Sequence, residues 1–376
     1  MTAIAIGFWV SVGLLVYTMV GYPIVLWLLA AVRGREPKTP PEPSSLPSVS
    51  LIVAAHDEET SIVAWVRSAL AFDYPREKLE IVVVSDGSTD RTIEWAAKAG
   101  ADLVLEVPRG GKVTALNAAV ERARGEVLAF SDANSTWGPD ALRCLVARLA
   151  DPGVGYVCGQ LRLEGEPGEN QEGVYWRYEM AIRSLESRLA GVTAGNGAIN
   201  AIRREDYIAL EPSRGQDISF PFELTRRGRR AVYEPAAIAR EPMASTLGAE
   251  FARKRRMHAG SWATILRHRM LSPRGYPPTY AFEVLSHRGL RYASPFLHVL
   301  ALAANAALLG EGPIYTISLI AQLALLAAAA VAELVPLRPL QIARYYVTVT
   351  AASAAGLWDY LRRGVPTTWE RAEGTR

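Results

Sequence analysis

The segments VSLIVAA (residues 49–55), IVVVSDGSTD (81–90) and VLAFSDAN (127–134) determine the fold class. Each begins with a continuous run of apolar, mostly β-branched residues, and a fourth such run covers 103–107. Buried strands are expected at 49–55, 81–84, 103–107 and 127–130. Helical patterns separate them, starting near Glu58 and covering 91–98, 112–123 and 139–149. This alternation predicts an α/β domain with a parallel sheet covered on both faces.

Acidic side chains follow the second and fourth of these strands directly. Ligands bind open α/β sheets at the carboxyl ends of the strands, so Asp86 and Asp132 are expected at a ligand site. Asp86 suits recognition of a base or ribose, or it belongs to a loop that only caps the next helix. Asp132 and Asn134 can present two oxygens to Mg²⁺ or Mn²⁺, or they form a solvated turn. Asp217, in the polar stretch GQD, is in isolation more typical of a surface or capping residue.

The composition indicates a membrane protein. Half of the 376 residues are hydrophobic, only 21% are charged, and the net charge of +3 gives no reason to expect a nucleic-acid partner. Residues 1–32 carry no charge, which predicts an uncleaved N-terminal span with a kink near Gly21. Arg33, Arg35 and Lys38 follow it and place the next segment in the cytoplasm.

The C-terminal third contains further apolar runs. Residues 293–310 and 312–332 are each long enough to span a bilayer, which gives three full spans with the first. The run 345–358 is short, and Arg362 and Arg363 follow it, so we expect a re-entrant or interfacial segment; a tilted fourth span is the alternative. Residues 251–291 hold nine Lys or Arg against one acid, Glu283, and predict interfacial helices or a solvated positive flank.

Taken together, the motifs resemble those of membrane-bound family 2 glycosyltransferases, the group that includes cellulose, chitin and hyaluronan synthases. The similarity lies in the order strand–HDEE, strand–SDGSTD, KVTALN, strand–SDAN, GNGA, GQD and the basic RKRRMHAG, and it covers nearly the whole chain. It implies a Rossmann-like GT-A domain inserted between transmembrane helices, and an inverting transfer from a nucleotide-diphospho-sugar, expected to be a UDP-sugar. It also implies a multi-pass protein of the inner membrane with a cytoplasmic catalytic domain.

The resemblance also implies roles for individual residues. Asp217 would be the general base that deprotonates the acceptor, and Asp132 and Asn134 would hold Mg²⁺ or Mn²⁺. The nucleotide would be bound by Ala54, Ala55, Glu58, Asp86, Lys112 and Asp132. The acceptor and the diphosphate would be contacted by Gly195, Asn196, Gly197, Arg253 and Arg256.

Two departures from the family pattern bear on function. Asn134 replaces the second Asp of D-x-D, which weakens a cation site without removing its oxygen ligand. The Gln and Trp of the Q-x-x-R-W motif are missing around Arg256, where Met257 stands in place of the Trp that stacks on an acceptor sugar. This argues against processive polymer synthesis.

We therefore predict a membrane-embedded glycosyltransferase that glycosylates a lipid-linked or glycan acceptor in the synthesis of envelope polysaccharide or glycolipid. The alternatives are a processive polysaccharide synthase and a non-catalytic sugar-nucleotide-binding subunit of an assembly complex. The expected regions are a transmembrane helix (1–33), a linker (34–48), the GT-A domain (49–250), interfacial helices (251–291), a C-terminal transmembrane region (292–361) and a cytoplasmic tail (362–376).

Overall fold

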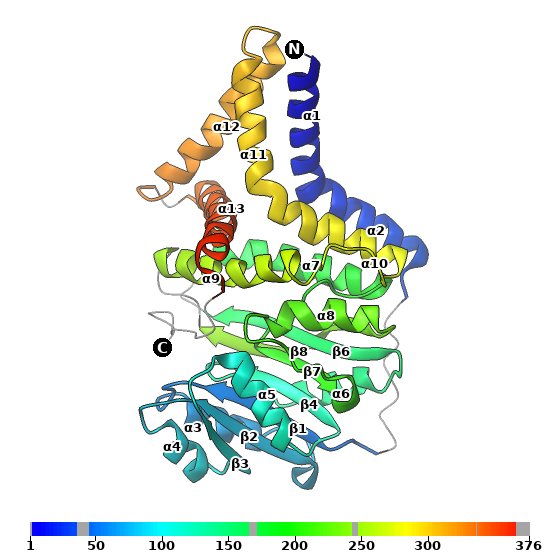
Figure 1. Ribbon diagram of the computed structural model, residues 1–376, viewed down its shortest axis with the longest axis vertical. Coiled ribbons are helices and arrows are strands. Elements are labelled where there is room, and N and C mark those ends of the chain that lie inside the picture. Colours follow the sequence, from blue (N-terminus) through cyan, green and yellow to red (C-terminus); the bar gives the residue numbers. More distant parts are fainter. Residues whose placement is uncertain (1, 36–44, 165–170, 243–246, 336, 366–376) are drawn as a thin grey trace.

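The computed structural model describes residues 2–35, 45–164, 171–242, 247–335 and 337–365. Most of the predicted linker, and the predicted tail from residue 366 on, lie outside these ranges. A sheet domain forms one end of the molecule, and long helices extend from it to the other end (Figure 1). The eight-stranded sheet has the order β3-β2-β1-β4-β7-β6-β8-β5.

The parallel half of the sheet consists of the four strands predicted from the apolar runs. These are β1 (Val49–Ala55), β2 (Leu79–Asp86), β3 (Leu103–Val107) and β4 (Val127–Asp132). β1 pairs in parallel with β2 on one side and with β4 on the other, and β3 pairs with β2. The four strand predictions are confirmed, with β2 and β4 longer than expected. In the register, Ala54 lies opposite both Val84 and Asp132, so these strands end at one edge.

Helices cover both faces of this half, as predicted. Val49, Leu51 and Val53 of β1 pack with α3 (Ile62–Leu70), α4 (Thr92–Ala99) and α6 (Ala141–Leu149). Ile52 and Ala54, which alternate with them, pack on the other face with α5 (Lys112–Arg122) and α8 (Gln216–Arg226). The period of two along a strand thus places successive side chains in two separate cores.

The sheet is mixed rather than purely parallel. β7 (Ile199–Arg203) runs antiparallel to β4 and to β6 (Val154–Glu164), and β8 (Arg230–Pro242) runs parallel to β6 and antiparallel to the short β5 (Thr136–Trp137). β7 begins beside the end of β4, where Ile199 pairs with Ser131. The antiparallel direction therefore brings the loop before β7 to the edge that carries Asp132.

The remaining elements form the helical end of the molecule and its junction with the sheet. The helices are α1 (Thr2–Val16), α2 (Tyr22–Arg33), α7 (Gln171–Leu189), α9 (Leu247–Leu266), α10 (Pro278–Glu283), α11 (Leu290–Ala307), α12 (Pro313–Val331) and α13 (Arg338–Arg363). The π-helical segments η1 (Tyr17–Gly21) and η4 (Val284–Gly289) join α1 to α2 and α10 to α11, and η2 (Arg76–Lys78) and η3 (Arg204–Asp206) are short 3₁₀ turns. The chain changes direction at η1, close to the predicted kink (Figure 1).

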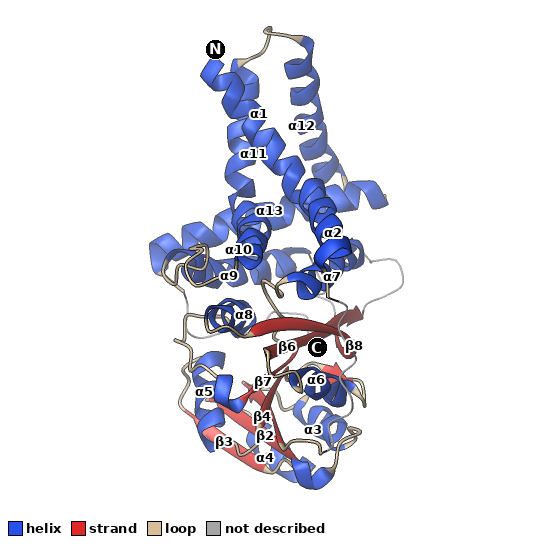
Figure 2. Ribbon diagram, turned by 90° about the vertical axis from the view of Figure 1, so that its right-hand side faces the viewer, coloured by secondary structure: helices blue, strands red, loops and turns tan. Residues whose placement is uncertain are grey.

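Among the described residues, two helices are long and apolar enough to cross a membrane: Thr2–Arg33 and Pro313–Val331. α11, which we predicted as a span over 293–310, is not one of them, because Arg291, His298 and Asn305 lower its hydropathy. It nevertheless runs beside α1 (Figures 1 and 2).

α13 extends well beyond the apolar run at 345–358. Figure 1 shows it almost end-on, so it crosses the direction of α1 and α11. It packs along α9, where Arg255 forms a bidentate ion pair with Asp359. At Gly356 the two helices are so close that a Cβ atom would lie 2.7 Å from Cβ of His258. The predicted re-entrant or interfacial position of this segment stays a prediction.

Candidate active site

The carboxylate at the end of β2 orders the loop that precedes α5. Asp86 is fully buried, and its Oδ1 accepts hydrogen bonds from the amides of Gly110 (2.7 Å) and Gly111 (3.0 Å). Gly111 has φ of +93°, a left-handed conformation that glycine adopts without strain. Because Lys112 follows directly, Asp86 positions the start of α5. Its predicted contact with the nucleotide stays a prediction.

Lys112 and Asp132 form an ion pair at the end of β4. Burial alone would lower the pKa of Lys112, but the charge of Asp132, and further those of Asp217 and Glu241, raise it above its usual value. The ammonium therefore stays charged among three carboxylates. A Cβ atom on Gly197 would lie 3.3 Å from Nζ of Lys112, so glycine there leaves room for this side chain.

Asp217 lies in the first turn of α8, in the wall of a cavity of about 270 Å³. Desolvation raises the pKa of its carboxyl, and the Lys112 charge opposes that shift. Its carbonyl oxygen accepts a hydrogen bond of 2.7 Å from the amide of Gly195. The loop before β7 therefore fixes the start of α8 directly. A cavity-lining carboxylate with a raised pKa is suited to general-base chemistry.

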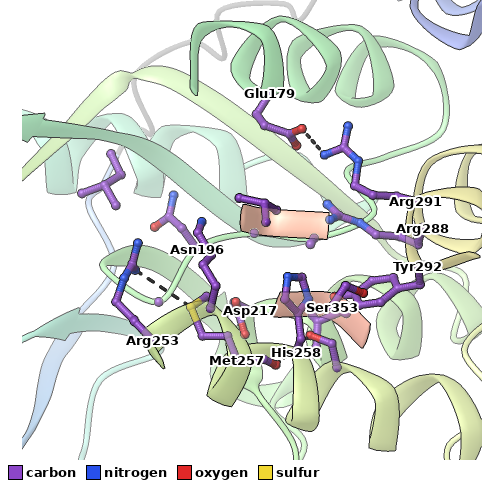
Figure 3. A pocket seen from close by; sticks show the side chains of 18 of the residues that line it. Glu179, Asn196, Asp217, Arg253, Met257, His258, Arg288, Arg291, Tyr292 and Ser353 are labelled. Carbon is purple, nitrogen blue, oxygen red and sulfur yellow. Dashed lines mark hydrogen bonds and ion pairs between the residues drawn. The ribbon is translucent and has the colours of Figure 1, made fainter. Parts of the chain in front are cut away.

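The cavity lies between the sheet edge and the helical end of the molecule (Figure 3). It brings together six of the predicted site residues: Asp132, Gly195, Asn196, Gly197, Asp217 and Arg253. Lys112 and Arg256 line an adjoining cavity that shares Gly197 and Asp217 with it. The predicted residues of the SDAN and GNGA motifs and of the basic segment thus meet around Asp217.

Other predicted residues lie apart from the cavity lining. Ala54 and Ala55 are buried in the sheet, and the amide of Glu58 donates to Oγ1 of Thr92 at 2.7 Å. β4 ends at Asp132, and Ala133 and Asn134 form a turn. Our argument that two residues of an extended chain present their side chains together therefore does not apply to Asn134. Its metal role stays a prediction.

The structure also brings to the cavity residues that were not among the predicted site residues. Glu241, at the end of β8, accepts a hydrogen bond from Ser135, and burial, followed by the charge of Asp132, raises its pKa to about 7. Glu179 of α7 pairs with Arg291 of α11, and Arg288 of η4 and His258 of α9 also line the cavity. Only the high count of basic residues over 251–291 pointed toward Arg288 and Arg291.

Comparisons with known proteins agree with this arrangement. Residues 50–209 match the model of glycosyl transferase family 2. The chain is 26% identical over 238 residues to an N-acetylglucosaminyltransferase of Neorhizobium galegae, covering 57% of this chain and 55% of that protein. It is 26% identical over 235 residues to a poly-β-1,6-N-acetyl-D-glucosamine synthase of Staphylococcus aureus, covering 59% and 56%. The chain thus spans only about half the length of these curated relatives.

A solved structure is similar over nearly the whole chain. It is the mannosyltransferase PcManGT of Pyrobaculum calidifontis in complex with GDP-Man and Mn²⁺, with a TM-score of 0.73 and 26% identity over 94% of this chain and 98% of that one. The expected Rossmann-like GT-A fold is confirmed by this similarity. Residues 50–209 therefore match a glycosyltransferase family 2 domain, and the fold of the chain is that of the GT-A glycosyltransferases.

Proposed function

We propose that this enzyme is an inverting glycosyltransferase that moves a sugar from a nucleotide-diphospho-sugar to a lipid-linked or glycan acceptor at a membrane. The observation that carries the proposal is the position of Asp217. Its carboxylate lines the cavity beside the Lys112–Asp132 pair, and the cavity extends from there toward the helices. The donor is a UDP-sugar by family resemblance, and a GDP-sugar is the second candidate because PcManGT binds GDP-Man.

The reaction needs one base and one cationic surface. Asp217 would accept the proton of the acceptor hydroxyl while that oxygen attacks the anomeric carbon from the face opposite the diphosphate. The bond between the anomeric carbon and the diphosphate oxygen breaks, and the electron pair leaves with the nucleoside diphosphate. Lys112, Arg253 and Arg256 would stabilise the negative charge that grows on this leaving group.

The side chains of the site supply only part of the ligands that a divalent cation needs. No group of three or more His, Cys, Asp or Glu side chains among the described residues could hold a metal by itself. Mg²⁺ and Mn²⁺ bound to nucleotides, however, are commonly held by one or two carboxylates together with the phosphates. Asp132 would supply one such ligand, with Asn134 as the predicted second. When bound, the ion would stabilise charge on the diphosphate.

The membrane placement is part of the same proposal. The apolar helix Thr2–Arg33 and the helix α12 would cross the inner membrane, with α11 beside the first. The basic α9 and the crossing α13 would lie at its cytoplasmic surface, above the catalytic domain.

Processive polymer synthesis is the second candidate, since two curated relatives carry N-acetylglucosamine transferase or synthase names. The acceptor side of this chain argues against it. Met257 is exposed where the family motif has Trp, and the nearby Trp262 is buried. The indole N–H of Trp262 donates to the carbonyl of Ser353 at 3.0 Å, and its ring packs edge-on against Tyr292. Trp262 is therefore a packing residue rather than a platform for a sugar.

The test is nucleotide release by the detergent-solubilised full chain, with UDP- and GDP-sugars, in the presence of membrane lipid extract. Release from one donor that requires the lipid extract and a divalent cation supports the proposal. Products longer than one added sugar would favour the processive candidate. Absence of release with every donor, despite intact folding, would contradict the proposal.

A further inference from the structure

The cavity carries positive charge on both sides of Asp217. Figure 3 shows Arg253 on one side of Asp217 and Arg288 with Arg291 on the other. Arg253 lies on the donor side, because its charge lowers the pKa of Glu241, the same carboxyl whose pKa the charge of Asp132 raises. Arg288 lies close enough to Asp217 for its charge to oppose the rise in that carboxyl's pKa. Arg288 is therefore a basic group on the side of Asp217 away from the donor.

Arg288 is oriented by a buried network, and its charge lowers the pKa of Glu186 and Glu179. Its Nε donates to Oγ1 of Thr193 at 3.0 Å, and the Thr193 hydroxyl donates to Glu186 at 3.2 Å. Glu186 in turn is bonded to Nδ1 of His287 at 2.6 Å. Among the described residues Arg288 forms no ion pair, whereas its neighbour Arg291 pairs with Glu179. Its guanidinium is directed into the cavity (Figure 3).

Polar atoms without partners lie in the same wall. Among the described residues, both ring nitrogens of His258 and the hydroxyl oxygen of Ser353 are buried and have no hydrogen-bond partner. Both residues line the cavity. Burial, and then the charge of Lys254, lowers the pKa of His258 to about 4, so the ring is neutral at physiological pH. Buried polar groups left unpaired cost about 1–3 kcal/mol each, so this wall is built for a polar ligand.

The far end of the cavity reaches the helices. Its lining there comes from η1, α11 and α13, with Met19, Ser294, Tyr345, Tyr346, Val349 and Thr350. η1 belongs to the helix Thr2–Arg33, which is long and apolar enough to cross a membrane. A ligand with a charged group at Arg288 can therefore extend in two directions within the cavity, toward Asp217 and toward these helices.

We propose that Arg288, aided by Arg291, His258 and Ser353, binds the phosphate of a lipid-phosphate-linked acceptor, whose sugar hydroxyl lies at Asp217 and whose chain extends among the helices. This rests on the proposed function and names its acceptor class. A guanidinium that is anchored through Nε presents its two terminal nitrogens to a phosphate with little loss of conformational entropy.

The test is direct binding to the detergent-solubilised full chain, measured by calorimetry. Farnesyl phosphate is the probe, farnesol lacks the phosphate, and mannose 1-phosphate lacks the lipid. We expect farnesyl phosphate to bind at least about tenfold more tightly than either control. Equal binding of farnesol would overturn the phosphate site, and equal binding of mannose 1-phosphate would overturn the lipid source.

Variants then localise the site. Arg288→Gln should weaken farnesyl phosphate binding by about tenfold or more, and Arg288→Lys should lose less. Arg227→Gln, an exposed arginine that follows α8, is the matched control and should bind as wild type does. Unchanged affinity of Arg288→Gln would overturn the assignment; if that variant fails to fold, the comparison of the three probes on wild type decides.

Donor binding, measured on the same wild-type samples, separates this inference from the proposed function. If a nucleotide sugar binds and farnesyl phosphate does not, only the acceptor inference falls. If no nucleotide sugar binds in the presence of Mg²⁺ or Mn²⁺, the proposed function falls whatever the lipid phosphate does.

Discussion

Replacing Gly195 by alanine should disrupt both the fold and the position of the general base. A Cβ atom at this position would lie 2.0 Å from the hydroxyl oxygen of Tyr156 and 2.8 Å from its Cζ. Tyr156 is fully buried and packs against Phe220, with ring centroids 6.0 Å apart. The backbone of Gly195 is also fixed, since its amide donates to the carbonyl of Asp217 and its carbonyl accepts from Arg183 at 3.0 Å.

The size of the effect follows from these contacts. An ordinary contact needs about 3.4 Å, so in Gly195→Ala the distance from the new Cβ atom to the Tyr156 hydroxyl oxygen is about 1.4 Å too short, and the Tyr156 ring is fully buried. Overpacking of this kind costs about 1–3 kcal/mol, and we expect about 2 kcal/mol or more here. For a domain of this size that lowers Tm by at least roughly 4 °C. Because the loop holds the start of α8, the turnover should fall as well.

A double-mutant cycle isolates the cause. The Tyr156 hydroxyl has no hydrogen-bond partner among the described residues, so Tyr156→Phe alone should change stability by less than about 0.5 kcal/mol. In the double variant the nearest ring atom is Cζ at 2.8 Å, so about half of the loss, or about 1 kcal/mol, should return. Thermal unfolding in detergent measures all four proteins. A Gly195→Ala variant as stable as wild type, or purely additive effects, would refute the reasoning.

Three further outcomes follow from the same structure. Glu283 is fully buried, and burial together with the Glu186 charge raises its pKa well above 4.5, so the folded state holds a proton that the unfolded state releases. The stability of the protein should therefore fall as the pH rises above about 4.5, and Glu283→Gln should remove this dependence. Tm measured over a pH series for the two proteins will check this. The raised pKa of Asp217 predicts that kcat declines as the pH falls through that value, because a protonated base cannot accept the acceptor's proton; a kcat that stays constant down to pH 4 would exclude this role. Gly356→Ala should lower Tm, because the new Cβ would lie 2.7 Å from Cβ of His258 and 3.0 Å from the amide nitrogen of Ala259. In the control Gly13→Ala the new Cβ has no atom within 4 Å, so Tm should stay the same or rise.

The parallel half of the sheet could be predicted from sequence because its strands are buried on both faces. Strands of this kind appear as continuous apolar runs, and the predicted bounds of β1 and β3 coincide with the observed ones. The antiparallel half gives a weaker signal. β7 has only five residues, and β8 contains Pro235 and forms an irregular register with β6, so neither matches a simple apolar run.

The candidate site could be predicted where its residues directly follow strands or begin helices. Asp132 is of this kind, since it ends a predicted strand and lines the cavity. Asp217, which also lines the cavity, was indicated by the family resemblance and not by its local sequence. Glu241 and Arg288 reach the cavity only through long-range packing, because β8 lies across the sheet and η4 docks from the helical end. No local spacing carries that information. The extended-chain argument for Asn134 did not hold, because the strand ends at Asp132 and Asn134 lies in the turn that follows.

The most direct test of the central claim is the release of nucleoside diphosphate by wild type and by Asp217→Asn, in the presence of membrane lipid extract. UDP- and GDP-sugars are compared with Mg²⁺, with Mn²⁺ and with EDTA. The account predicts release from one donor, its loss in EDTA, and a fall of about 10²- to 10⁴-fold in kcat for Asp217→Asn with donor affinity retained. Release at the wild-type rate by Asp217→Asn would contradict the account.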